Sequence, residues 1–179
     1  MSLTESEYTV LRQTIAVRGT VRMALLPATL LGWAVIAGAF GTAPYRLVLS
    51  LGVLVAGFEA IHALHVGVER IGRYLQVYYE TVDGARWETT AMKLGPALPG
   101  GGIDPLFTLV FVSSTIANLI PAATVPTRPI ELVLLGLLHA LFIVRLVRAR
   151  GAAARQRAVD LETFRAVLSQ DSHDGRPTV

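Results

Sequence analysis

The chain has 179 residues, of which 53% are hydrophobic and 16% are charged, and its formal net charge at pH 7 is +3. A soluble domain carries about 25% charged residues, so this composition predicts a membrane protein. The lack of cysteine excludes disulfides, thiolate metal sites and cysteine nucleophiles. The basic residues are not interleaved with aromatic residues as on a nucleic-acid-binding face, so no nucleic-acid partner is expected.

Four apolar segments predict an all-α integral membrane protein built as a four-transmembrane-helix bundle. A spanning helix needs about 20 mostly apolar residues, and the segments that qualify are 23–43, 45–68, 103–123 and 129–147. We expect residues 1–22 to form a cytoplasmic amphipathic helix that leads into the first span. Residues 69–102 are predicted to be a cytoplasmic loop into which the second helix extends, and residues 148–179 a cytoplasmic basic helix with a flexible tail.

Small residues in the first two spans predict where helices approach one another. Ala34 and Gly38, and likewise Gly52 and Ala56, have the small-xxx-small spacing that lets membrane helices pack closely.

The cytoplasmic loop contains a short amphipathic segment. Trp87, Ala91 and Leu94 fall on one side at helical spacing. This pattern is typical of a helix that lies in the membrane interface and is anchored by its tryptophan.

The positions of the basic residues predict the orientation in the membrane. Arg12, Arg18 and Arg22 precede the first span, and the two loops on the opposite side hold just Arg46 and Arg128. Further basic residues lie in the middle loop and after the fourth span: Arg70, Arg73, Arg86, Lys93, Arg145, Arg148, Arg150, Arg155 and Arg157. The positive-inside rule then places both termini in the cytoplasm, and the expected location is a bacterial inner membrane. The last five arginines, from Arg145 to Arg157, are also candidates for binding anionic lipid headgroups.

The second helix carries ionisable residues within its apolar run. At about 100° per residue, its polar residues fall within an arc of about 120°: Glu59, His62, His65, Glu69, Arg73, Gln76 and Glu80. A charge that faces lipid near the bilayer centre costs at least about 2.5–3.5 kcal/mol, so Glu59 is expected to face protein, water or a partner. We predict a polar membrane cluster of Glu59, His62, His65 and His139, and a cytoplasmic extension of Glu69, Arg73, Gln76 and Glu80.

Depth in the membrane selects the expected partner of His139. Counting inward from Tyr45 and Pro129 at 1.5 Å per residue places His139 roughly 15 Å deep, Glu59 roughly 21 Å and His62 roughly 25 Å. The smaller mismatch predicts that Glu59 pairs with His139.

Two functions compete with a structural role for this cluster. Haem b could be held between the second and fourth spans by His62 or His65 and His139. A Glu/His relay could translocate protons or ions, although the chain has no internal repeat of the kind that transporters use.

No signature in the sequence assigns a catalytic residue or a metal site. We therefore expect a small non-catalytic membrane protein without a cofactor, which serves as a subunit or interaction module and uses the polar seam on its second helix. Its expected partners are membrane lipids and either further copies of itself or another membrane protein. Whether it is also an enzyme stays open.

Overall fold

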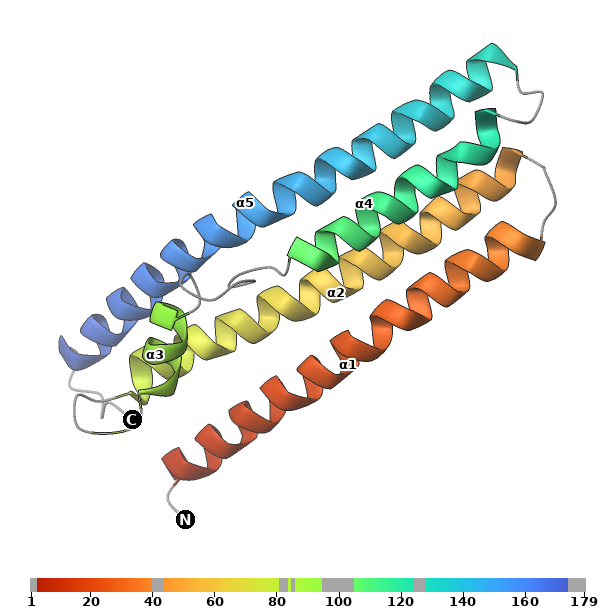
Figure 1. The fold of residues 1–179 in the computed structure, drawn as a ribbon. Coiled ribbons are helices and arrows are strands. Elements are labelled where there is room, and N and C mark those ends of the chain that lie inside the picture. The colour runs from red at the N-terminus through yellow and green to blue at the C-terminus, as the bar shows by residue number, and fades with distance from the viewer. Residues whose placement is uncertain are drawn as a thin grey trace. The chain divides into compact units, whose positions relative to one another are not determined.

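The computed structural model describes residues 3–39, 44–80, 84, 86–94, 105–123 and 128–173, and these form helices with short connections (Figure 1). The elements in chain order are α1 (Leu3–Ala39), α2 (Pro44–Tyr78), α3 (Trp87–Leu94), α4 (Pro105–Leu119), the 3-10 helix η2 (Ile120–Ala123) and α5 (Pro129–His173). The described ranges contain no strand, and the all-α prediction is confirmed.

Three of the helices are long and apolar enough to cross a membrane, judged by length and composition. These are α1 with 37 residues, α2 with 35 and α5 with 45. The third expected span, 103–123, corresponds to the shorter α4 of 15 residues followed by η2.

The long helices continue beyond the apolar segments that the sequence indicates. The expected amphipathic helix 1–22 and the first span are one continuous helix, and Pro27 lies inside it. The second helix runs past residue 68 to Tyr78, as predicted, and α5 runs past residue 147 to His173.

The chain divides into two compact units, and α1, α2 and α5 each contribute a segment to both. Unit 1 consists of Met1–Val21, Leu64–Gly102 and Gly151–Val179, and unit 2 consists of Arg22–Ala63 and Ile103–Arg150.

Unit 2 has an apolar core between α2, α4 and α5. The Phe58 ring packs edge-on against Phe111 at 5.5 Å and Phe142 at 5.9 Å between ring centroids. Leu54, Ile61 and further apolar residues complete this core.

Unit 1 is held by aromatic contacts and by charges. The Tyr74 ring meets Phe164 of α5 at 5.8 Å, and Tyr79 meets Tyr8 of α1 at 5.6 Å. Leu75, which follows Tyr74 in the sequence, is buried. These contacts join α1, α2 and α5 within the unit.

The close approach of α1 and α2 lies at Gly57, which the spacing pattern missed. A Cβ atom added to Gly57 would overlap the Thr29 side chain, whereas one added to Gly38 or Gly52 would meet no other described atom within 4 Å. The packing predicted at Gly38 and Gly52 is therefore wrong, because spacing along one helix does not say which of its faces meets the neighbour.

Candidate functional site

Asn118 of α4 is the centre of a buried polar network in unit 2. Its side-chain oxygen accepts hydrogen bonds from Ser50 Oγ at 2.6 Å and Trp33 Nε1 at 3.0 Å. Its Nδ2 donates to the Leu47 carbonyl oxygen at 2.9 Å and lies 3.0 Å from Nε2 of His139. An amide has two donors and two acceptor sites, so all four are used. We call Trp33, Ser50, Asn118 and His139 the Asn118 network; it links α1, α2, α4 and α5.

The same contacts fix the state of His139. Its Nδ1 lies 2.7 Å from the Leu135 carbonyl oxygen, which can only accept a hydrogen bond. Nδ1 therefore carries the proton, and Nε2 accepts from Asn118. This assigns the neutral imidazole in one tautomer, and both ring nitrogens are engaged.

Glu59 pairs with Arg145 rather than with His139. Arg145 of α5 donates through Nη2 to Glu59 Oε2 at 2.8 Å, and its guanidinium also lies 5.6 Å from the centre of the Phe58 ring. The expected Glu59–His139 contact is wrong, because Glu59 pairs with Arg145 and His139 pairs with Asn118. Both side chains of the pair remain partly exposed, Arg145 by 40% and Glu59 by 43%.

The two histidines of α2 have separate surroundings. The His62 ring stacks on Phe58 with 5.7 Å between centroids. His65 Nε2 lies 3.5 Å from Glu69 Oε1. A haem ligated through His139 would have to displace either Asn118 or Leu135 from a ring nitrogen.

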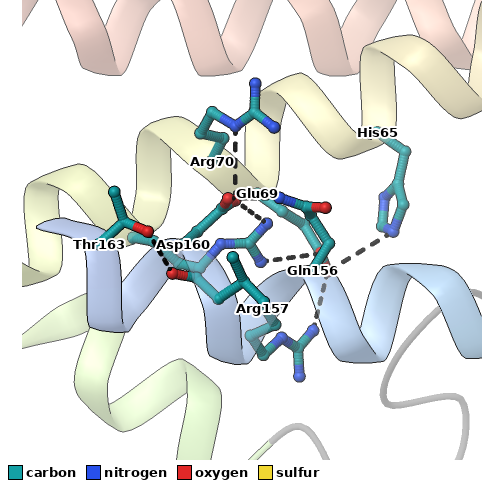
Figure 2. Close-up of polar contacts among 9 residues, drawn as sticks. His65, Glu69, Arg70, Gln156, Arg157, Asp160 and Thr163 are labelled. Carbon is teal, nitrogen blue, oxygen red and sulfur yellow. Dashed lines mark hydrogen bonds and ion pairs between the residues drawn. The ribbon is translucent and has the colours of Figure 1, made fainter.

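Unit 1 contains a second polar site, which we call the charge cluster: Glu69, Arg70 and Arg73 of α2 with Arg157 and Asp160 of α5 (Figure 2). Arg73 donates to Glu69 at 3.2 Å and pairs with Asp160 at 3.0 Å. Arg157 reaches the other oxygen of Glu69 at 2.8 Å, and Arg70 reaches Asp160 at 3.4 Å. The cluster therefore joins the two helices through alternating charges.

Burial makes the charge cluster sensitive to any loss of a partner. The Arg73 side chain is only 2% exposed and that of Asp160 8%. Burial alone would raise the pKa of Asp160. A hydrogen bond from Gln156, the charge and hydrogen bonding of Arg73 and the charge of Arg70 together outweigh burial and hold the pKa below its ordinary value.

Gln76 and Glu80, the last two residues of the predicted cytoplasmic extension, contact α3 rather than α5. Glu80 accepts hydrogen bonds from the backbone N–H groups of Glu88 and Thr89, and from the Thr89 hydroxyl at 2.5 Å. Gln76 also donates to Thr89 at 3.2 Å. A carboxylate on the free N–H groups of a helix N-terminus is a favourable capping arrangement, so Glu80 fixes the start of α3 against α2.

Glu88 ties α3 to α1 as well. Arg12 donates to Glu88 Oε1 at 2.6 Å. Burial raises the pKa of Glu88 despite the opposing charge of Arg12, and the nearby carboxylate of Glu80 adds to the increase. Within unit 1, α3 is thus held by side chains from two helices.

The predicted site residues are divided among four sets of contacts rather than gathered into one seam. Glu59 belongs to the pair with Arg145, His139 to the Asn118 network, and Glu69 and Arg73 to the charge cluster. Gln76 and Glu80 hold α3. Within the described ranges, no group of three His, Asp or Glu side chains is arranged to hold a metal ion.

Sequence reasoning overlooked Arg145 and Asn118 as central residues. Counting inward at 1.5 Å per residue places Arg145 about 24 Å from Pro129, close to the 21 Å of Glu59, so the depth argument favours Arg145 over His139. Arg145 was instead grouped with the five arginines expected at lipid headgroups. Two of these five, Arg145 and Arg157, have carboxylate partners, while Arg148 and Arg155 are exposed.

Comparison of the chain with protein-family models, with curated proteins and with solved structures gives no match.

Proposed function

We propose that this chain is a non-catalytic integral membrane subunit that assembles with a partner membrane protein, or with a second copy, at the Glu59–Arg145 pair. Three long apolar helices support insertion into a membrane. For the third span, α4 and η2 together rise about 30 Å, from 15 residues at 1.5 Å and four at 2.0 Å. This length matches the hydrocarbon core of a bilayer.

The partial exposure of the Glu59–Arg145 pair is the observation that carries the proposal. Its two side chains are 43% and 40% exposed, yet they lie about 21 and 24 Å along their helices from the external ends. A hydrocarbon core of about 30 Å includes that level, and lipid tails cannot hydrogen-bond to a carboxylate or a guanidinium. Polar groups of a partner helix would supply hydrogen bonds to the exposed carboxylate of Glu59 and guanidinium of Arg145.

The contacts of the pair favour assembly over proton transfer. A relay group must release and take up a proton, whereas the arginine that holds Glu59 stays protonated in proteins. The next polar residues along α2 are engaged with Arg73, Arg157 and Asp160 in the charge cluster. These contacts support a structural role for the polar residues of α2.

Assembly can be tested by measuring the mass of the protein in native lipid nanodiscs and by cross-linking beside the pair. Glu59→Gln keeps hydrogen-bonding capacity and should retain assembly, whereas Glu59→Leu and Arg145→Leu should lose it. The exchange of both charges, Glu59→Arg with Arg145→Glu, should restore part of it. Glu131→Leu removes a carboxylate near the start of α5 and serves as the matched control, with assembly unchanged.

Proton flux into proteoliposomes separates the relay from the subunit. We expect no pH-driven flux above that of empty vesicles, and the same result for Glu59→Gln. Flux in the parent protein that disappears in Glu59→Gln, with thermal stability unchanged, would overturn the proposal in favour of a relay. Equal mass in the parent protein and in Glu59→Leu would also contradict it.

The proposed orientation has both termini and the segment 69–102 in the cytoplasm of a bacterial inner membrane. It rests on the arginine distribution and the positive-inside rule. Reporter fusions after residues 43 and 126 should be external, and fusions after 95 and 165 cytoplasmic. An external signal at residue 95 would rule out this arrangement of four spans.

A further inference from the structure

We propose that α3 docks on anionic phospholipid headgroups at the cytoplasmic surface of the membrane, through a basic and aromatic face made of Arg86, Trp87, Thr90 and Lys93. The inference rests on the membrane insertion proposed above and adds a second interaction surface, distinct from the Glu59–Arg145 pair.

Trp87, Thr90 and Lys93 are exposed and share one side of α3, and the exposed Arg86 immediately precedes the helix. At about 100° per residue they fall within an arc of about 120°. The Trp87 side chain is 64% exposed, and Arg86, Thr90 and Lys93 are exposed as well. The face therefore combines a large amphipathic ring with two cations.

The acidic groups near α3 are turned to other partners. Glu88 accepts from Arg12, and Glu80 binds the N–H groups at the start of the helix. Among the described residues, the exposed face consequently carries positive charge and no carboxylate. Anionic headgroups complement that charge, and tryptophan prefers the level of the headgroups.

The placement of α3 along α2 sets its distance from the apolar segment. A Cβ atom added to Gly72 would lie 2.9 Å from Glu88 Oε2, so the first turn of α3 is beside Gly72. Gly72 follows the predicted end of the second span, residue 68, by about 6 Å of helix. The headgroup region extends about 5–8 Å beyond the hydrocarbon core on each side, so this turn lies at headgroup level.

The hydrogen bonds that hold α3 make its exposed face a fixed surface. Its first turn is contacted by Gln76 of α2, by Glu80 just after the end of α2, and by Arg12 of α1. A helix that is already ordered loses less conformational entropy when it binds. Trp87 would thus enter the interface without a prior folding step.

Tryptophan fluorescence of the full chain tests the proposal directly, because the sequence contains two tryptophans, Trp33 and Trp87. The protein is placed in nanodiscs of phosphatidylcholine alone or with phosphatidylglycerol. The difference between the parent protein and Trp87→Phe gives the signal of Trp87. We expect emission at shorter wavelength and strong quenching by lipids brominated near the headgroup, both greater with phosphatidylglycerol.

Single charge removals test the role of the cations. Arg86→Gln and Lys93→Gln should each weaken the docked state in phosphatidylglycerol discs by about fivefold, the effect of one basic residue near an anionic surface. Arg165→Gln removes an exposed charge on α5 and should leave the Trp87 signal unchanged. An equal effect of all three substitutions would overturn the proposal, because it would show that the Trp87 signal depends on the net charge of the protein and not on the charges beside Trp87.

Trp33 separates a failure of this proposal from a failure of the proposed function. Trp33 lies in the apolar part of α1, so lipids brominated in their chains should quench it in Trp87→Phe. If Trp33 is quenched but Trp87 is reached by aqueous iodide in every lipid mixture, α3 faces water and the docking proposal is wrong. A Trp87 that is shielded from both iodide and brominated lipid would assign the face to a protein partner and also overturn it. If neither tryptophan is quenched by lipid, membrane insertion itself fails.

Discussion

Asn118 donates a hydrogen bond to His139 Nε2 across 3.0 Å, while its other hydrogen-bonding sites are filled by Ser50, Trp33 and the Leu47 carbonyl. One amide thereby connects four helices of unit 2 and fixes the tautomer of a histidine that is 1% exposed. Such a residue stabilises both the packing of the helices and their register.

Asn118→Leu should destabilise unit 2 strongly. The substitution removes the partner of the Trp33 N–H and of His139 Nε2, and each unpaired group costs about 1–3 kcal/mol, whereas the Ser50 hydroxyl can still donate to the Arg46 carbonyl. Unfolding by SDS from mild detergent micelles measures the loss. Thr115→Val on the same helix is the control, because the Thr115 hydroxyl bonds only to its own helix at the Phe111 carbonyl among the contacts found. A loss no larger than that of Thr115→Val would show that the network contributes little.

Gly57→Ala should separate α1 from α2, because the added methyl group overlaps Thr29. Overpacking of this kind costs about 1–3 kcal/mol. Gly52→Ala lies on the same helix in open space and should change stability by no more than about 0.5 kcal/mol. Thermal unfolding of the two variants in identical lipid discs provides the comparison, and equal stabilities would contradict the close approach at Gly57.

Arg73 and Asp160 should be energetically coupled. Arg73→Met leaves two carboxylates of the charge cluster without this buried partner, and breaking a buried ion pair costs about 3–5 kcal/mol. Asp160→Asn should cost less, because the amide still accepts a hydrogen bond. The double variant should be more stable than the sum of the two losses predicts, by about 0.5–3 kcal/mol. Strict additivity would mean that the two residues do not interact, and the exposed Arg165→Met should be neutral within about 0.5 kcal/mol.

Acid should remove the stabilisation that Asp160 provides. The pKa of Asp160 is lowered in the folded protein, so the folded state favours the carboxylate more than the unfolded state does. Its contribution is complete above the ordinary aspartate pKa of about 3.9 and is lost as the pH falls through the lower folded value. The stability difference between the parent protein and Asp160→Asn should therefore be large at pH 6 and shrink below about pH 4. Chemical unfolding at several pH values measures it, and a difference that is constant with pH would contradict the charged state of Asp160.

The sequence by itself determined the helical class and the positions of the apolar segments. Composition and runs of apolar residues depend on local order along the chain, so the long helices α1, α2 and α5 could be recognised from it. The extension of α2 beyond residue 68 was also readable, because polar residues continued at helical spacing up to Glu80.

The tertiary structure decided which polar groups meet. Periodicity placed Glu59, Glu69 and Glu80 on one side of α2, but it could not reveal that this side faces Arg145, then Arg157, then α3. Asn118 carries no sequence signal of its role, because its partners are three side chains and one backbone carbonyl that come from three other helices. A pairing between helices depends on their rotation and axial offset, and the packing between helices, such as that of Phe58, Phe111 and Phe142 in unit 2, cannot be read from the pattern within any one helix.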